Sequence, residues 1–254
     1  MSAEPGLLAG RCAIVTGGAR GLGAAIARAF ADAGAKAAVL DLPEALARPS
    51  AFHGSFSLAC DVSDESSLAQ AIAAAAARLG AIDIAVANAG VVPPWRAAGE
   101  LDMAEWDRAF AVNVRGVALT VKHASVQMKT GGSIIAMGSI MSVSGAAGQM
   151  LYTATKHAVL GIVRAAAHDL GSRGIRVNAL GPGPVATEAL KARVAARAAS
   201  GGETVERAMA ALAGTPLHRM ATEIDVARAA LFLASDLSSG ITGKLVPVDA
   251  GLLA

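Results

Sequence analysis

The chain has one tyrosine, Tyr152, and it lies four residues before Lys156. On a helix this spacing places both side chains on one face, with the ammonium within reach of the phenol oxygen. A neighbouring positive charge favours the phenolate and lowers a phenol pKa that is ordinarily about 10. The pair could therefore exchange a proton with a substrate. By spacing alone, a surface tyrosine beside a solvated lysine is the commoner arrangement.

A glycine-rich turn is the second candidate site. The segment Thr16–Gly23 reads TGGARGLG and separates an apolar run from a helical stripe. Glycines let a backbone approach a pyrophosphate, and the free N–H groups of a helix N-terminus favour its charge. The spacing G-x3-G-x-G differs from the commoner G-x-G-x-x-G fingerprint, and such turns also serve simple strand-to-helix packing. The residues that we expect at the phosphates are Gly17, Arg20, Gly21, Leu22 and Gly23.

Asp41 favours NAD as the nucleotide. It ends the next apolar run, 18 residues after Gly23, near the separation at which an acidic residue reaches the adenosine ribose. A carboxylate accepts hydrogen bonds from ribose hydroxyls and repels a 2′-phosphate. Leu42 follows, so the basic residue that would accept NADP is missing there. Arg20 in the glycine turn keeps NADP open as the less favoured cofactor.

The elements that must position these residues alternate along the chain. Short β-type runs followed by longer helical stripes predict an α/β fold with a mostly parallel sheet. Because Pro247 cannot donate to a ladder, we expect the last strand at or near a sheet edge. The expected strands cover residues 12–15, 37–40, 56–60, 82–87, 133–137, 175–180 and 244–248, and the expected helices cover 22–33, 64–79, 103–128, 150–171 and 223–234.

Composition excludes several classes of protein. The 254 residues are 54% hydrophobic and 3% aromatic, with a net charge of +2, which disfavours both disorder and a nucleic-acid partner. Residues 130–155 carry no charge but are studded with glycine, so we expect no membrane helix. Cys12 and Cys60 lie in apolar runs, where buried, reduced cysteines are typical. With no secretory signal in the first residues, these features predict a cytoplasmic protein without a metal site.

The set of motifs, in this order, resembles that of the short-chain dehydrogenase/reductase family, in its single-domain branch. The resemblance covers residues 11–251. The matching family patterns are T-G-x3-G-x-G at Thr16–Gly23, N-A-G at Asn88–Gly90, an asparagine at Asn113, a serine at Ser139, Y-x3-K at Tyr152–Lys156 and P-G-x3-T at Pro182–Thr187.

The resemblance implies a doubly wound Rossmann-type fold, with a seven-stranded, mostly parallel sheet in the order 3-2-1-4-5-6-7 and helices on both faces. It implies an NAD(H)-dependent oxidoreductase that interconverts a secondary alcohol and a ketone by hydride transfer. Tyr152 would be the general acid/base, and Lys156 would lower its pKa and hold the nicotinamide ribose. Ser139 would hydrogen-bond the substrate oxygen, and Asn113 would fix a helix distortion and a proton-relaying water. The implied cofactor-binding residues are Gly17, Arg20, Gly21, Leu22, Gly23, Asp41, Asp61, Val62, Asn88, Gly90, Tyr152, Lys156, Pro182, Val185 and Thr187.

Departures from the family pattern are few and touch no implied catalytic role. Ala87 replaces the frequent first asparagine of N-N-A-G, Met137 and Gly138 precede Ser139 where a second serine is common, and Ala250 interrupts the usual G-G. The Y-x6-K spacing of enoyl reductases is absent, which argues against double-bond reduction.

The substrate pocket is the part on which the sequence says least. We interpret residues 1–254 as a single dinucleotide-binding and catalytic domain, with 183–221 as a substrate-binding flap within it. By analogy, the pocket residues are Trp95, Met141, Gln149 and Leu190, which predict a neutral, fairly lipophilic substrate. An anionic substrate stays open because of the basic residues Arg193, Arg197, Arg207 and His218.

Two other functions and an assembly state complete the expectations. A 3-oxoacyl-thioester reductase of the same family is the first alternative, and a non-catalytic NAD-binding scaffold is the second. The helices expected at 103–128 and 150–171 contain many small residues. In the family the equivalent helices pair between subunits, so the resemblance implies a homotetramer.

Overall fold

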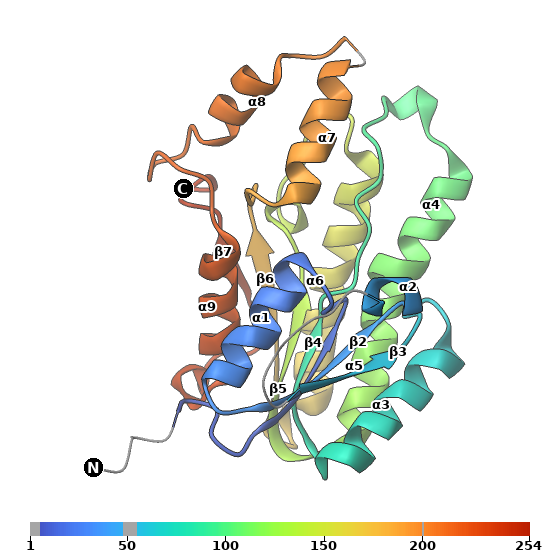
Figure 1. The fold of residues 1–254 in the computed structure, drawn as a ribbon, viewed down its shortest axis with the longest axis vertical. Helices are drawn as coiled ribbons and strands as arrows, with labels where there is room; N and C mark the ends of the chain where they lie inside the picture. The colour runs from blue at the N-terminus through green and yellow to red at the C-terminus, as the bar shows by residue number, and fades with distance from the viewer. Residues whose placement is uncertain (1–5, 48–54, 200) are drawn as a thin grey trace.

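The computed structural model describes residues 6–47, 55–199 and 201–254 (Figure 1). Its centre is a seven-stranded sheet in the order β3-β2-β1-β4-β5-β6-β7, in which every neighbouring pair is parallel. The predicted fold class and strand order are therefore confirmed. The strands are β1 Cys12–Thr16, β2 Lys36–Asp41, β3 Ser55–Ala59, β4 Ile82–Ala87, β5 Met128–Met137, β6 Ile175–Pro182 and β7 Leu245–Val248.

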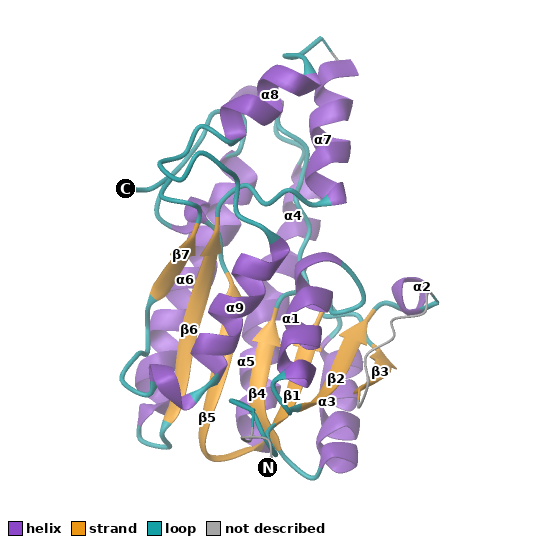
Figure 2. Ribbon diagram, turned by 60° about the vertical axis from the view of Figure 1, so that its left-hand side comes forward, coloured by secondary structure: helices purple, strands orange, loops and turns teal. Residues whose placement is uncertain are grey.

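Helices cover both faces of the sheet (Figure 2). Helices α1 and α9 pack on one face, and α3, α5 and α6 pack on the other. The α-helices are α1 Gly21–Asp32, α2 Pro43–Leu46, α3 Glu65–Leu79, α4 Met103–Phe110, α5 Gly116–Gln127, α6 Met150–Gly171, α7 Glu188–Ala199, α8 Val205–Leu212 and α9 Glu223–Ala234. Shorter helical turns are η1 Ala98–Glu100, η3 Ile140–Ser142 and η4 Asp236–Ser238, and η2 Ala111–Arg115 is a π-helical turn.

The apolar strands form this sheet because each can bury both of its faces. All residues of β1 are buried; Ile14 packs with the α3, α5 and α6 layer, whereas Val15 packs with the α1 and α9 layer. Successive side chains of a strand point to opposite faces, so an unbroken apolar run suits a parallel strand covered by helices on both sides. The parallel arrangement then brings the carboxyl ends of all strands to one edge, where the candidate site residues lie.

Some boundaries differ from the sequence prediction. The helix expected over 103–128 is interrupted at η2, where the backbone widens into a π turn and α4 gives way to α5. Strand β5 begins at Met128 instead of Ser133, and its pairing with β4 shifts register between Ile82 and Ile84. Helix α2 begins at a proline and was not expected. The segment 183–221 folds into α7 and α8, which stand beyond the carboxyl edge of the sheet (Figures 1 and 2).

Two smaller expectations are confirmed. Strand β7, which contains Pro247, lies at the edge of the sheet. Cys12 and Cys60 are free and buried, and burial raises the pKa of the Cys60 thiol to about 11. Among the described residues, no helix combines the length and the apolarity that a bilayer crossing requires.

Candidate active site

The carboxyl ends of β5 and β6 and the first two turns of α6 bring the proton-transfer candidates together. Ser139 follows β5 directly, and Tyr152 and Lys156 occupy successive turns of α6. The Lys156 Nζ lies 5.6 Å from the centre of the Tyr152 ring. The Ser139 hydroxyl lies close enough to the Tyr152 phenol to lower the pKa of that phenol. The spacing prediction of a shared helix face is therefore confirmed for this pair.

Burial dominates the electrostatics of the pair. It raises the pKa of the Tyr152 phenol, and the Ser139 hydroxyl and the Arg193 charge each oppose that rise. Burial also lowers the pKa of Lys156 to about 8, since only 6% of the residue is exposed. The Lys156 Nζ donates to the Met137 carbonyl oxygen at 2.7 Å. In this arrangement the cation that acts on the phenol is Arg193, while the lysine is turned towards the end of β5.

Asn113 lies in the π turn η2 and joins two segments of the site. Its Oδ1 accepts from the Val91 N–H at 2.8 Å, and its Nδ2 donates to the Val91 carbonyl at 2.8 Å. The Nδ2 also lies 3.4 Å from the Thr155 hydroxyl, one residue before Lys156. The asparagine is buried and therefore fixes the segment after Gly90 against α6. The expected helix distortion at this residue is present.

The glycine turn between β1 and α1 fits a phosphate. Gly17 and Gly21 have φ values of +63° and +55°, in the left-handed region that glycine adopts without strain. At Gly23 a Cβ would lie 2.2 Å from the Gly17 carbonyl oxygen, so no larger residue fits. Helix α1 has no side-chain cap at its start, where Arg20 is the N-cap residue. Its first N–H groups can therefore bind an anion.

Asn88 fixes this turn against the end of β4. Its Nδ2 donates to the carbonyl oxygens of Thr16 and Gly17 at 3.0 and 2.9 Å. The buried Thr16 hydroxyl in turn accepts from the Asn88 and Ala89 N–H groups. A rigid glycine turn is therefore built from two strand ends that are far apart in the sequence.

Asp41 lies beside the turn, at the end of β2. Its Oδ2 accepts from the Ala19 N–H at 3.0 Å, and its Oδ1 accepts from the Leu42 N–H at 2.8 Å. On the next strand, Cys60 donates its N–H to the Asp41 carbonyl, which places Asp61 and Val62 at the same edge. The Asp61 Oδ1 is held by the Ser63 N–H and hydroxyl, and Val62 is buried. These acceptors and apolar surfaces suit the sugar and base of an adenosine.

The residues expected at the other end of a dinucleotide follow β6. Pro182 is its last residue, and Val185 forms a bridge with Ala221. The Thr187 hydroxyl accepts from the Leu190 N–H at 3.2 Å and so caps the first turn of α7. The expected cofactor residues thus lie along one edge of the sheet, from the end of β3 to the segment after β6. The glycine turn, Asp41 and this continuity fit a dinucleotide.

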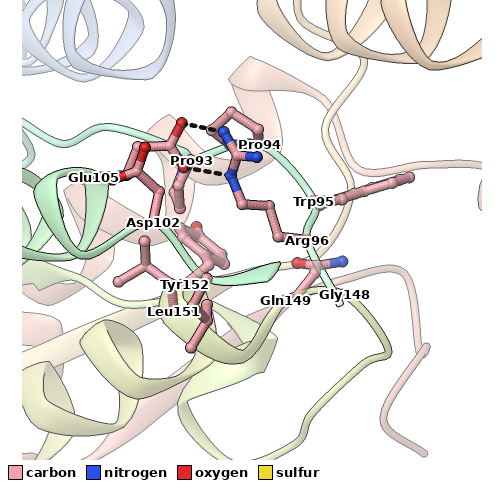
Figure 3. Close-up of a pocket in the computed structure, with 11 residues that line it drawn as sticks. Pro93, Pro94, Trp95, Arg96, Asp102, Glu105, Gly148, Gln149, Leu151 and Tyr152 are labelled. Carbon is pink, nitrogen blue, oxygen red and sulfur yellow. Dashed lines mark hydrogen bonds and ion pairs between the residues drawn. The ribbon is translucent and has the colours of Figure 1, made fainter. Parts of the chain in front are cut away.

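A pocket beside Tyr152 is the candidate substrate site (Figure 3). Trp95 and Gln149, two of the four expected substrate residues, line it. Met141, on η3, and Leu190, in the first turn of α7, are not among the residues that line it. The lining residues are Pro93, Pro94, Trp95, Arg96, Leu101, Asp102, Glu105, Gly148, Gln149, Leu151 and Tyr152.

An ion pair that the sequence did not reveal closes one wall of this pocket. The Arg96 guanidinium donates to both Glu105 carboxylate oxygens at 2.8 Å (Figure 3). This bidentate geometry is the strong form of such a pair. It joins the segment after β4 to α4. The two residues belong to no motif and lie in separate elements. The only signal for this ion pair in the sequence is that residues of opposite charge lie nine positions apart.

The buried ammonium gives a prediction about stability. Lys156→Met removes a charge whose pKa is about 8 in the folded protein, against an ordinary value of 10.5. Below pH 8 the wild-type group is charged in both states, so the cost of burying it is present in full; it fades as pH rises through 10.5. We expect Lys156→Met to stabilise the folded chain at pH 7 by about 1 to 3 kcal/mol, with the gain lost at high pH.

Denaturant unfolding of wild type and Lys156→Met across this pH range measures the difference. Lys129→Met, at an exposed lysine, is the matched control and should show no such pH dependence. A Lys156→Met variant that is less stable than wild type at pH 7, by the same amount at every pH, would contradict the burial argument.

Comparison with known proteins gives matches over nearly the whole chain. A protein-family model described as enoyl-(acyl carrier protein) reductase matches residues 17–253. Short-chain dehydrogenase reductase 5 of Arabidopsis thaliana is 40% identical, over 96% of this chain and 95% of its own length. Cis-4-hydroxycyclohexanecarboxylate dehydrogenase of Sinomonas cyclohexanicum is 39% identical, over 96% of this chain and 97% of its own. The crystal structure of levodione reductase superposes with a TM-score of 0.89 at 28% identity, covering 96% of this chain and 97% of that one.

Proposed function

The chain belongs to the short-chain dehydrogenase/reductase family, and from this premise we propose that it interconverts a secondary alcohol and a ketone, with NAD(H) as the hydride carrier. The observation that carries the proposal is the cluster of Ser139, Tyr152 and Lys156 at the same sheet edge as the glycine turn. A proton donor and a dinucleotide cradle on one edge are what hydride transfer to a carbonyl requires.

Each residue of the cluster has a distinct role in the proposed reaction. Tyr152 gives its proton to the carbonyl oxygen during reduction and takes it back during oxidation. Ser139 hydrogen-bonds the same oxygen and holds it near the phenol. Bound NAD(H) supplies or accepts the hydride at the substrate carbon. Because Lys156 donates to one carbonyl only, its other N–H groups are placed to bind ribose hydroxyls. The cation that lowers the pKa of the Tyr152 phenol is Arg193, not Lys156 as the spacing predicted.

Asn113 acts by position in this proposal. Its side chain is fully used on Val91 and Thr155. We therefore assign to it the π turn itself, which sets the distance between α5, the segment after Gly90 and the buried Lys156. We propose that the backbone of this turn, rather than the Asn113 side chain, binds the proton-relaying water that the family resemblance implies.

The segment 183–221 is proposed as the substrate-binding part of a single catalytic domain over residues 1–254. Helices α7 and α8 stand beyond the carboxyl edge of the sheet (Figures 1 and 2). Because the relative from Sinomonas is named for a ring-bearing secondary alcohol, we propose that cyclic secondary alcohols and ketones belong to the substrate class.

We also propose a homotetramer and a cytoplasmic location. Gly161 and Ala165 lie on the exposed side of α6, where small residues let a second helix approach closely. Two free, buried cysteines suit a reducing compartment. Light scattering that gives the mass of a monomer would contradict the first proposal.

Two other functions have weaker support. The matching family model carries the description enoyl-(acyl carrier protein) reductase. The Y-x3-K spacing and the proximity of Ser139 to the Tyr152 phenol instead favour protonation of a carbonyl oxygen. A 3-oxoacyl-thioester reductase uses that same chemistry and differs only in its substrate. A non-catalytic scaffold would have no use for a buried Lys156 one turn from Tyr152.

Tyr152→Phe tests the reaction. Without the phenol hydroxyl, we expect kcat for oxidation of secondary alcohols to fall by about 100- to 10,000-fold, the usual contribution of a general acid/base. NAD affinity, measured by calorimetry, should stay near the wild-type value because the ring remains. Assays follow NADH formation over a panel of cyclic and acyclic secondary alcohols. Turnover that persists unchanged in Tyr152→Phe would refute the assigned role.

Asp41→Ser tests the choice of cofactor. The substitution removes the carboxylate that repels a 2′-phosphate, so we expect the NAD to NADP ratio of kcat/KM to fall by about 10- to 100-fold. Asp32→Ser, at the end of α1, makes the same change of charge away from the glycine turn and serves as control. An unchanged ratio in Asp41→Ser would mean that Arg20, rather than Asp41, decides the preference.

A further inference from the structure

Two guanidinium groups share one aromatic face beside the substrate pocket. Arg193 and Arg197 are one turn apart on α7. The Arg197 Cζ stands 4.0 Å from the centre of the Trp95 ring, and the Arg193 Cζ stands 5.6 Å from it. Trp95 itself lines the pocket of Tyr152. Stacking on an aromatic ring fixes the direction of a guanidinium without neutralising it.

Neither arginine has an acidic partner in the described part of the chain. Arg96, which lines the pocket, is by contrast paired with Glu105 at 2.8 Å. Arg193 is also partly buried, and this desolvation lowers its pKa. A half-buried cation without a counter-ion is costly, and a bound anion relieves that cost.

The Arg193 guanidinium lies close to Tyr152, the proposed proton donor. It is close enough to Tyr152 for each group to shift the pKa of the other. Trp95 and Tyr152 also line the same pocket, whose other walls include the apolar residues Pro93 and Leu151 (Figure 3). An anion held by Arg193 would therefore lie near the Tyr152 phenol, and so near the carbon that reacts.

We propose that Arg193 binds a carboxylate of the substrate, so that this site prefers a small hydroxy acid or oxo acid to the corresponding neutral alcohol or ketone. The inference rests on the proposed function and adds a substrate class to it. The carboxylate takes no part in the redox step: the alcohol carbon gives a hydride to NAD, and the hydroxyl proton passes to Tyr152.

A planar carboxylate suits this position better than the phosphate of a carrier-bound thioester. A guanidinium fork binds a carboxylate through two parallel hydrogen bonds. In a carrier or coenzyme thioester, the phosphate is separated from the reacting carbon by the whole pantetheine arm. Arg197, which is exposed at the rim, is placed to draw the anion in, whereas Arg193 is placed to hold it.

The test compares acids with their own methyl esters. The acids are lactate, 3-hydroxybutyrate and 4-hydroxycyclohexanecarboxylate, in which the distance between the hydroxyl and the carboxylate increases. Each acid is assayed beside its methyl ester. We expect the wild type to prefer at least one acid to its ester. Arg193→Gln should lower kcat/KM for that acid by about 10- to 100-fold while the ester stays within about threefold. Arg193→Lys should recover part of the loss.

Arg228→Gln is the matched control, since it removes an exposed arginine from α9, outside the segment 183–221. It should leave both substrates unchanged. Equal losses for acid and ester in Arg193→Gln would overturn the proposal, because that pattern reports a structural role. Faster reduction of a 3-oxoacyl carrier protein than of any free oxo acid would also overturn it, by assigning the cations to a phosphate or an acidic carrier.

A binding measurement separates this inference from the proposed reaction. Calorimetry measures the binding of cyclohexanecarboxylate and of its amide to the protein with NAD. Neither compound has a hydroxyl that could be oxidised. Binding of the acid that weakens in Arg193→Gln but not in Arg228→Gln supports the carboxylate site, even if no alcohol is turned over. Tyr152-dependent turnover of neutral alcohols, with no binding of the acid, would overturn the carboxylate site and leave the proposed reaction standing.

Discussion

The Lys156 ammonium lies in the interior and donates to a single backbone carbonyl, that of Met137. Both Lys156 and Met137 are buried, so the protonated ammonium destabilises the folded state. The hydrogen bond to Met137 fixes the direction of the lysine side chain. The Tyr152 side chain, one turn earlier on α6, is partly buried, and this burial raises the pKa of its phenol. Two groups that would be ordinary on a surface are thereby held at the edge where a substrate and a dinucleotide can meet.

The surrounding elements maintain that geometry through backbone contacts. Asn113 joins the π turn to the segment after β4, and Asn88 joins the end of β4 to the glycine turn. The parallel sheet supplies the common edge, because all of its strands end on the same side. The proposed proton-transfer cluster and the glycine turn are therefore connected through β4 rather than through the segment beyond the sheet.

Much of this arrangement could be predicted from local patterns. Apolar runs such as Cys12–Val15 identify strands buried on both faces, and the four-residue spacing of Tyr152 and Lys156 fixes their shared helix face. The π turn, by contrast, leaves no trace in the periodicity of 103–128, which predicts one helix where three elements follow one another. Only the family resemblance predicted a distortion at Asn113, whose contact with the distant Val91 exists only in the tertiary fold.

The substrate side shows the same limit. Trp95 and Gln149 were expected there and line the pocket, but Met141 and Leu190 do not. The position of Arg193 and Arg197 over the Trp95 ring depends on how α7 packs beyond the sheet edge. Helical periodicity predicts that the two arginines share a helix face, but it does not predict which side chain they contact. Local sequence identifies which groups can carry charge, whereas packing decides which of them remain unpaired.

The most direct test of this account is the titration of the single tyrosine by the ultraviolet absorbance of its phenolate, with and without NAD, beside the pH profile of alcohol oxidation. The account predicts that burial raises the pKa of Tyr152 above its ordinary value in the free protein. Bound NAD, whose oxidised nicotinamide is cationic, should lower it, and the oxidation rate should rise with the same midpoint as the phenolate in the complex. A rate that rises where the phenol does not ionise would contradict Tyr152 as the group that exchanges the proton.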